Sequence, residues 1–290
     1  MTMATTANMT MTSEFETEQQ ARRAVIAACL KMNALGINQA KAGNISVRWH
    51  RGAKDGFLIT PSGLPYEDTT EDDIVWLAID DDPDHPQPSP LQKFFPNAAI
   101  TGANAGSSEG SSTRSGSNAD TRALVRPVSP PSSEWRMHSM IYRQQPPQRA
   151  GAVVHTHSPY ASSLACLPRI QTEGIPAFHY MIAVAGGTTI RCAPYATFGT
   201  QALSDFAAVA LRGRCACLLA NHGVLAYQNS LPRALTLAQE VETLARMYWQ
   251  ALQIGAPVIL DDAEMQRVIE RFKTYGKPAL KAITPGNSNG

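Results

Sequence analysis

Two histidines separated by one residue are the first candidates for chemistry in this sequence. His155 and His157 follow the apolar run Val153-Val154. If residues 152–157 form a β-strand, the alternation of side chains places both imidazoles on the same face. Two imidazoles on one rigid face make half of a transition-metal site, although two polar residues at a strand end can also simply face water.

A third histidine strengthens the metal-site interpretation. His222 follows the strand-like run Leu218-Leu219-Ala220, at a position where loops commonly carry functional groups. Three neutral imidazoles leave the fourth position of Zn²⁺ open, which is typical of catalytic sites. Such an ion polarises a carbonyl or enolate oxygen, or activates water. Imidazole also suits Mn²⁺, Co²⁺ or Fe²⁺, so the choice of metal stays open.

Glu134 is the carboxylate to consider beside such an ion. It lies near the start of a predicted helix, where the helix dipole favours an anion. Its role is therefore either helix-end electrostatics or proton transfer. In the second case, apolar burial beside Trp135 is expected to keep its pKa in a working range.

Three pairs of small residues are candidates for anion binding. They are Gly43-Asn44, Ser62-Gly63 and Ser132-Ser133, each at a predicted turn or helix start. Backbone N–H groups and hydroxyls in such places hold phosphates, although each pair alone is also an ordinary turn or cap. The sequence has neither a P-loop nor a dinucleotide fingerprint, so a nucleotide is not indicated.

The elements that must position these residues are strands with helices between them and at both ends. Ser132-Ser133 are expected to cap a helix, Gly36 to end one, and Pro232 to lie in the first turn of another. We predict strands at 43–48, 57–60, 74–79, 152–157, 190–193, 217–220 and 224–227, and helices at 13–35, from 133 onward, and at 159–167, 200–212, 232–254 and 262–275. This pattern predicts one α/β domain with a mixed sheet covered by helices.

Composition limits the class of protein. The 290 residues carry a formal net charge of +1 without a basic block, which argues against a nucleic-acid or membrane-surface partner. We find no apolar run of membrane-spanning length and no signal-peptide pattern. The five scattered cysteines favour a reducing cytoplasm.

One low-complexity segment interrupts the predicted domain. Residues from about 81 to 130 are dense in Pro, Ser, Gly, Asn and Asp and lack a sustained apolar pattern. We expect disordered tails at 1–12 and 283–290 and a domain at 13–282 containing this insertion. Because the insertion joins Ser132-Ser133-Glu134, we hypothesise a mobile flap that folding does not require.

Several motifs together resemble the class II aldolase/adducin family. They are, in chain order, Gly43-Asn44-Ile45-Ser46-Val47-Arg48, Ile59-Thr60-Pro61-Ser62-Gly63, Ser132-Ser133-Glu134-Trp135, His155-Thr156-His157-Ser158, Ile175-Pro176-Ala177-Phe178-His179-Tyr180-Met181-Ile182-Ala183, Cys192-Ala193-Pro194-Tyr195-Ala196-Thr197-Phe198-Gly199-Thr200, Asn221-His222-Gly223 and Phe272-Lys273-Thr274-Tyr275-Gly276. The match covers about residues 13–80 and 130–280. Within the family, it is closest to the branch that acts on L-fuculose 1-phosphate.

The resemblance implies a central, mostly antiparallel sheet and a C4 homotetramer with active sites between subunits. It assigns His155, His157 and His222 to Zn²⁺, Asn44, Ser62, Gly63, Ser132 and Ser133 to the substrate phosphate, Glu134 to acid–base catalysis, Tyr180 of a neighbouring subunit to proton donation, and Phe198 and Tyr275 to the aldehyde side. The implied reaction cleaves a small ketose 1-phosphate, L-fuculose 1-phosphate or a related 5-deoxy-pentulose 1-phosphate, reversibly to dihydroxyacetone phosphate and an aldehyde such as lactaldehyde.

Three alternatives on the same fold stay open. A pentulose-phosphate 4-epimerase uses the same histidines, but that branch has Asp where this chain has Glu134. A methylthioribulose-1-phosphate dehydratase is the second alternative. An adducin-like scaffold without catalysis is the third, although such members lack the metal histidines that this chain retains. The sequence does not fix the aldehyde, because a methylene at that end is worth only about 1–3 kcal/mol of discrimination.

Overall fold

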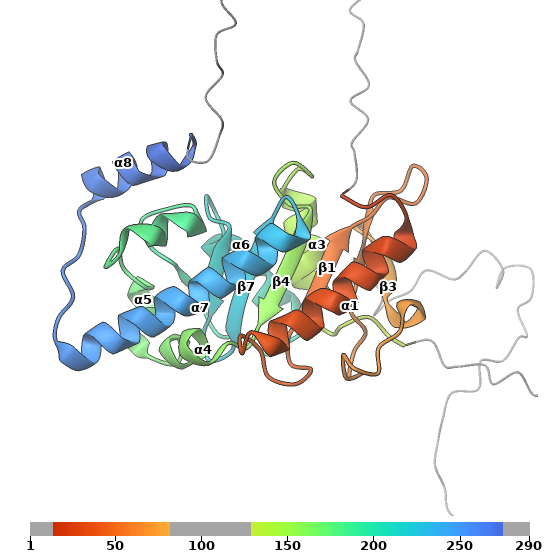
Figure 1. The fold of residues 1–290 in the computed structure, drawn as a ribbon, viewed down its shortest axis with the longest axis horizontal. Coiled ribbons are helices and arrows are strands. Elements are labelled where there is room, and N and C mark those ends of the chain that lie inside the picture. Colours follow the sequence, from red (N-terminus) through yellow and green to blue (C-terminus); the bar gives the residue numbers. More distant parts are fainter. Residues whose placement is uncertain (1–13, 82–128, 275–290) are drawn as a thin grey trace, which may run out of the picture.

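A seven-stranded sheet with helices on both faces forms the body of the protein (Figure 1). The computed structural model describes residues 14–81 and 129–274. The strands are β1 (Asn44–Arg48), β2 (Gly56–Ile59), β3 (Val75–Ala78), β4 (Ala152–Thr156), β5 (Cys192–Ala193), β6 (Ala216–Leu219) and β7 (Gly223–Gln228). The helices are α1 (Glu18–Ala34), α3 (Trp135–Gln144), α4 (Pro159–Ala165), α5 (Pro168–Glu173), α6 (Gln201–Ala210), α7 (Leu231–Ile254) and α8 (Asp262–Phe272), with short 3₁₀ turns η1 (Glu71–Asp73) and η2 (Tyr180–Ala185).

The strand order is β3-β2-β1-β4-β7-β6-β5. All neighbouring pairs are antiparallel except β5 and β6, so the expected mostly antiparallel sheet is confirmed. The register places Asn44 opposite His155 and Thr156 opposite Val224. The start of β1, the end of β4 and the start of β7 therefore meet at one end of the sheet.

Each face of the sheet packs against its own helices. In Figure 1, α1 and α7 cross one face, and α3 and α6 lie behind the other. Val154 points into the first apolar layer, with Val25 and Val241, and Val153 points into the second, with Ile141. Strands buried on both faces read as continuous apolar runs, which is why the Val153-Val154 pair precedes the histidines.

Local sequence signals explain where the helices begin and end. Thr17 and Gln20 form a capping box at the start of α1, and Gly36 follows its end with a φ of +68°, as predicted. Pro232 lies in the first turn of α7. The prediction that Ser132-Ser133 cap a helix is wrong, because the N-cap residue of α3 is Glu134 itself. Glu134 thus lies just outside the helix, and its carboxylate makes no capping hydrogen bond.

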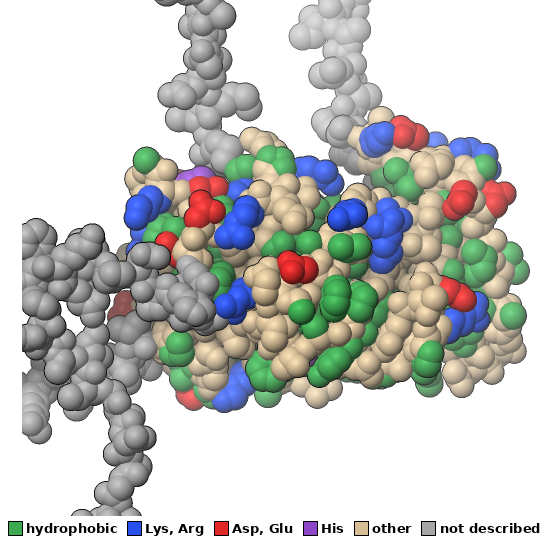
Figure 2. Space-filling view, turned by 180° about the vertical axis from the view of Figure 1, so that it is seen from behind, with side chains coloured by type: hydrophobic (Ala, Val, Ile, Leu, Met, Phe, Trp, Pro, Cys, Tyr) green, Lys and Arg blue, Asp and Glu red, His purple; other side chains and the backbone are tan. Residues whose placement is uncertain are grey.

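The charged residues on the described surface are mixed in sign. Figure 2 shows the face opposite α1 and α7, where acidic and basic side chains are interspersed with apolar ones. All five cysteines are free. Among the described residues, no helix is both long and apolar enough to cross a membrane. The predicted tails, Tyr275 and all but the edges of the insertion lie outside the described residues.

Candidate metal centre

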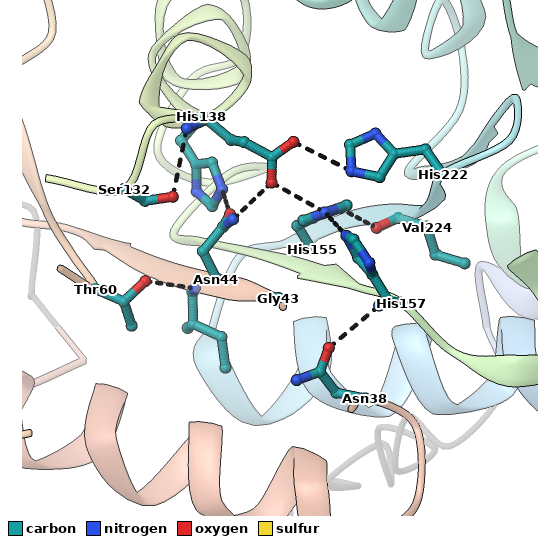
Figure 3. Close-up of polar contacts among 12 residues, drawn as sticks. Asn38, Gly43, Asn44, Thr60, Ser132, His138, His155, His157, His222 and Val224 are labelled. Carbon is teal, nitrogen blue, oxygen red and sulfur yellow. Dashed lines mark hydrogen bonds and ion pairs between the residues drawn. The ribbon is translucent and has the colours of Figure 1, made fainter. Parts of the chain in front are cut away.

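Three histidines and one glutamate converge at the end of the sheet where β1, β4 and β7 meet. The side-chain ligand atoms of Glu134, His155, His157 and His222 all lie within 4.8 Å of one another. The imidazole rings meet edge to face, with centroids 4.8–4.9 Å apart (Figure 3). The structure thus brings together the three predicted metal ligands and the predicted acid–base residue.

Separate local features position each histidine. His155 lies within β4, and His157 lies just beyond its end, where the backbone N–H donates to Asn38 Oδ1 at 3.2 Å. His222 lies in the tight connection between β6 and β7. There Asn221 adopts a φ of +53°, a left-handed conformation that asparagine tolerates better than most residues. Gly223 follows, so close to β4 that a Cβ would lie 2.2 Å from the Thr156 carbonyl oxygen.

The hydrogen bonds of His155 determine which of its nitrogens faces the cluster. Its Nδ1 donates to the Val224 carbonyl at 2.8 Å, so a neutral ring carries its lone pair on Nε2. That Nε2 lies 3.0 Å from His157 Nε2 and 3.1 Å from Glu134 Oε2. Acceptor atoms this close repel one another unless a proton or a cation lies among them. The donor set therefore fits a divalent ion held by imidazole nitrogens, and the carbonyl bond behind His155 is the support that metal-binding histidines usually have.

Burial and charge act differently on the three imidazoles. Burial lowers the pKa of His157 to about 4 and that of His222 to about 4, with the charge of His155 adding to both effects. Burial also works to lower the pKa of His155, but the Glu134 carboxylate and the Val224 carbonyl outweigh it and raise that pKa. Of the three imidazoles, His155 is therefore the one whose protonated form its surroundings favour.

Glu134 is buried, with an exposed fraction of 4%. Burial works to raise the pKa of its carboxyl group, but His155, His222 and the Asn44 amide outweigh it and hold that pKa well below the usual range. Burial alone therefore does not keep this pKa in a working range, and the expectation for Glu134 beside a metal ion stays a prediction. Oε1 lies 3.2 Å from His222 Nε2, so each carboxylate oxygen faces one histidine.

Two further residues connect to Glu134 through hydrogen bonds, and the sequence did not predict these connections. Asn44 donates from Nδ2 to Glu134 Oε2 at 2.9 Å, although the resemblance assigned it to a phosphate. His138 contacts Asn44 Oδ1 through Nε2 at 2.6 Å and is fully buried. No role at this site was predicted for His138 from the sequence. Its spacing of four residues from Glu134, about one helical turn, is the signal that could have identified it.

The predicted phosphate-binding pairs lie on neighbouring loops. Ser62 donates its backbone N–H to the Pro130 carbonyl at 2.8 Å, and Ser132 donates its own to the Thr60 carbonyl at 3.0 Å. Gly63 has a φ of +75° and an open space where a Cβ would point. The Lys41 ammonium lies 2.5 Å from the Gly63 carbonyl oxygen, so a positive charge stands beside this loop.

The two remaining predicted residues that the structure describes, Tyr180 and Phe198, are exposed. Tyr180 begins η2, is about half exposed, and its ring contacts are with His179 and Phe272. Phe198 is exposed, and the Gly199 backbone after it packs against the Ser133 carbonyl. Phe198 is therefore near the Ser132-Ser133 loop.

Comparison with known proteins gives a consistent result. A family model described as Class II Aldolase and Adducin N-terminal domain matches residues 23–249. The chain is 44% identical over 264 residues to a protein of Rhodospirillum rubrum named 5-methylthioribulose-1-phosphate/5-deoxyribulose-1-phosphate aldolase, covering 91% of this chain and 96% of that one. It is 43% identical over 255 residues to a protein of Escherichia coli K12 named L-fuculose phosphate aldolase, covering 88% and 94%. A solved structure named L-fuculose 1-phosphate aldolase superimposes with a TM-score of 0.65 at 33% identity, covering 88% of this chain and 96% of that one.

Proposed function

The chain belongs to the class II aldolase and adducin family, and from this we propose that it is a metal-dependent aldolase that cleaves a small ketose 1-phosphate to dihydroxyacetone phosphate and an aldehyde. The observation that carries the proposal is the buried Glu134 carboxylate in contact with two of the three clustered histidines. A non-catalytic scaffold has no need of such a costly arrangement of buried polar groups.

His155, His157 and His222 would hold the ion, and Zn²⁺ is our first choice because imidazole and carboxylate ligands suit it. When bound, the metal supplies Lewis-acid polarisation of the substrate's oxygen atoms. Burial keeps His157 and His222 in the neutral, metal-binding form, and the Val224 carbonyl orients His155. Protons therefore compete with the metal ion mainly at His155.

Glu134 would hold and transfer the proton at the dihydroxyacetone phosphate end of the substrate. Its Oε2 accepts a hydrogen bond from Asn44, and its Oε1 lies 3.2 Å from His222 Nε2, so the carboxylate is positioned before the substrate arrives. Ser62, Gly63, Ser132 and Ser133 would bind the phosphate through the two adjacent loops, with the Lys41 charge beside them. Asn44 keeps a second amide hydrogen for the substrate, because only one is used on Glu134.

We propose that the protein acts as a C4 homotetramer in which Tyr180 completes the site of a neighbouring subunit as a proton donor. The support is that Tyr180 is about half exposed and packs near α8, whereas the histidines lie at the end of the sheet. The phosphate loops lie beside Phe198, which is exposed and would line the aldehyde side with Tyr275. Light scattering tests the assembly. Mixing Tyr180→Phe subunits with Glu134→Gln subunits tests sharing, because hybrids would regain activity only if the two residues act across an interface.

The remaining proposals concern the whole chain. We propose one catalytic domain at 13–282 that contains the insertion at about 81–130. We also propose a cytoplasmic location, which the five free cysteines favour.

The aldehyde end is the least determined part of the substrate. The relatives named above are called aldolases of L-fuculose phosphate and of methylthioribulose and deoxyribulose 1-phosphates, which differ at that end. The deciding experiment is release of dihydroxyacetone phosphate from these ketose 1-phosphates by the purified protein, with and without a chelator. Metal-dependent release supports the aldolase and ranks its aldehydes. Conversion of a sugar phosphate without release of dihydroxyacetone phosphate would instead indicate an epimerase or a dehydratase. A protein that binds no metal and converts none of the sugars would indicate a scaffold.

A further inference from the structure

A chain of buried hydrogen bonds leads away from Glu134 into the interior. Glu134 Oε2 accepts from Asn44 Nδ2 at 2.9 Å, and Asn44 Oδ1 lies 2.6 Å from His138 Nε2 (Figure 3). His138 Nδ1 lies 2.6 Å from Ser46 Oγ, which lies 2.8 Å from the Tyr142 hydroxyl. We call Asn44, His138, Ser46 and Tyr142 the polar chain. All four residues are at least nine-tenths buried.

Only one direction of donation satisfies every bond from the carboxylate to the serine. A carboxylate only accepts, so Asn44 must turn its NH₂ group toward Glu134 and its carbonyl oxygen toward His138. An amide oxygen also only accepts, so His138 must carry its proton on Nε2. A neutral ring then has its acceptor at Nδ1, and Ser46 must donate to it. Tyr142 in turn donates to Ser46.

His138 therefore decides which way Asn44 faces. If the proton were on Nδ1, the Nε2 lone pair would face the Asn44 oxygen at 2.6 Å, and the amide would turn over to relieve the contact. A turned amide would put its oxygen 2.9 Å from the Glu134 carboxylate, where it repels instead of donating. Ser46 and Tyr142 oppose this by holding the Nε2–H tautomer. Burial, which lowers the pKa of His138 to about 3, keeps the ring neutral.

We propose that His138 is a positioning residue for Glu134, acting through the Asn44 amide, and that Ser46 and Tyr142 fix its tautomer. The proposal rests on the proposed function, because Glu134 is the acid–base residue there. His138 bonds with Asn44 and Ser46, and with neither a metal ligand nor Glu134 itself. Its effect is on the direction of one N–H group, and so on the orientation of the carboxylate during proton transfer.

Two substitutions at His138 separate this role from simple packing. His138→Gln can again present an N–H to the Asn44 oxygen, whereas His138→Met fills a similar volume without a donor. We expect His138→Met to lower kcat about 10- to 100-fold with metal content within about twofold of wild type. We expect His138→Gln to recover most of the kcat, and Ser46→Ala and Tyr142→Phe to fall between the two.

Ser139→Ala is the matched control for a structural effect. Ser139 is the next residue of α3, is also buried, and donates to the Ile79 carbonyl at 2.7 Å on another side of the helix. It should lose stability and keep kcat. Equal kcat in His138→Met and wild type would overturn the proposal. So would a fall in kcat for His138→Met that His138→Gln does not recover.

A neutron crystal structure of the deuterated enzyme at pH 7.5 gives a test that does not depend on activity. Deuterium on Nε2 of His138 and on Ser46 Oγ directed at Nδ1 supports the proposal, and deuterium on Nδ1 overturns it. If the protein proves not to be an aldolase, the tautomer result still stands, because it tests the polar chain and the kinetics test the reaction.

Discussion

Glu134 Oε2 lies 3.1 Å from His155 Nε2, and both side chains are buried. The bond from His155 Nδ1 to the Val224 carbonyl turns the lone pair of a neutral ring toward that carboxylate oxygen. A positive charge must lie between the two acceptors, and it is either a proton on the ring or a metal ion. Proton binding and metal binding at this pair therefore exclude each other.

Metal affinity should consequently depend on pH through His155. Its pKa is raised, against the effect of burial, by Glu134, and a proton on its Nε2 must leave when the ion binds. Affinity should therefore rise with pH, by up to about tenfold per unit, until His155 is neutral. In Glu134→Gln the cause of the raised pKa is gone, and the slope near neutral pH should become smaller. Chelator competition at pH 6, 7 and 8 measures both slopes, and equal slopes would contradict this account.

Glu134→Gln should also separate metal binding from catalysis. The three histidines stay in place, so metal content measured by mass spectrometry should remain close to that of wild type. An amide cannot transfer the proton, so kcat for release of dihydroxyacetone phosphate should fall by about 100-fold or more. Glu242→Gln is the matched control, because Glu242 is a buried carboxylate that accepts from the backbone N–H groups of Tyr160 and Ala161. It should lose stability and keep activity. Loss of metal in Glu134→Gln would mean that the carboxylate is needed to hold the ion.

Parts of this site could be predicted from the sequence because they depend on local periodicity. The alternation of side chains in a strand is enough to put His155 and His157 on one face. The polar chain depends instead on contacts between residues far apart in the sequence. Asn44 and Glu134 are 90 positions apart, and Asn44 and His138 are 94 positions apart. Only the register of β1 against β4 and the placement of α3 bring them together. The helix cap was predicted wrongly because Ser132, Ser133 and Glu134 are all acceptable N-cap or near-cap residues, and tertiary contacts select among them.

The stability of the protein should fall with acid through His138. Burial lowers its folded-state pKa to about 3, with the charge of His155 adding to the effect and that of Glu134 opposing it. An unfolded histidine titrates near pH 6.5, so below that pH the unfolded chain binds a proton that the folded chain does not. Stability therefore decreases as pH falls from about 6.5 toward 3, by up to about 1.4 kcal/mol per unit from this residue.

The substitution His138→Gln should make that decrease shallower. Urea unfolding at fixed protein concentration and pH 7.5, 6.0 and 5.0 measures it. Ser139→Ala, which changes a buried residue of the same helix that does not titrate, should keep the wild-type slope. The account fails if His138→Gln and Ser139→Ala lose stability with acid at the same rate.

Lys41→Met should weaken the binding of substrate without changing the fold. The ammonium lies 2.5 Å from the Gly63 carbonyl, beside the loop proposed to bind phosphate, and it offsets the charge of a bound dianion. We expect KM to rise about tenfold, with less effect at high salt, where an exposed charge is screened. Lys54→Met removes another exposed lysine, in the turn between β1 and β2, and should leave KM unchanged. Equal KM values for Lys41→Met and wild type at low salt would remove Lys41 from the phosphate site.

Gly223→Ala should disturb the metal centre through the backbone. A Cβ at this position would lie 2.2 Å from the Thr156 carbonyl oxygen and 3.3 Å from His155 Cε1, so β7 and β4 must separate where they hold His222 and His155. We expect a loss of about 1–3 kcal/mol of stability and a lower affinity for the metal, since overpacking forces the backbone to shift. Gly255→Ala is the control, because that glycine follows α7, has an extended φ of 169°, and has no atom within 4 Å of the added Cβ. Thermal unfolding and metal content should both distinguish the two variants. A Gly223→Ala protein that melts and binds metal like Gly255→Ala would show that the close approach of β4 and β7 does not hold His222 in place.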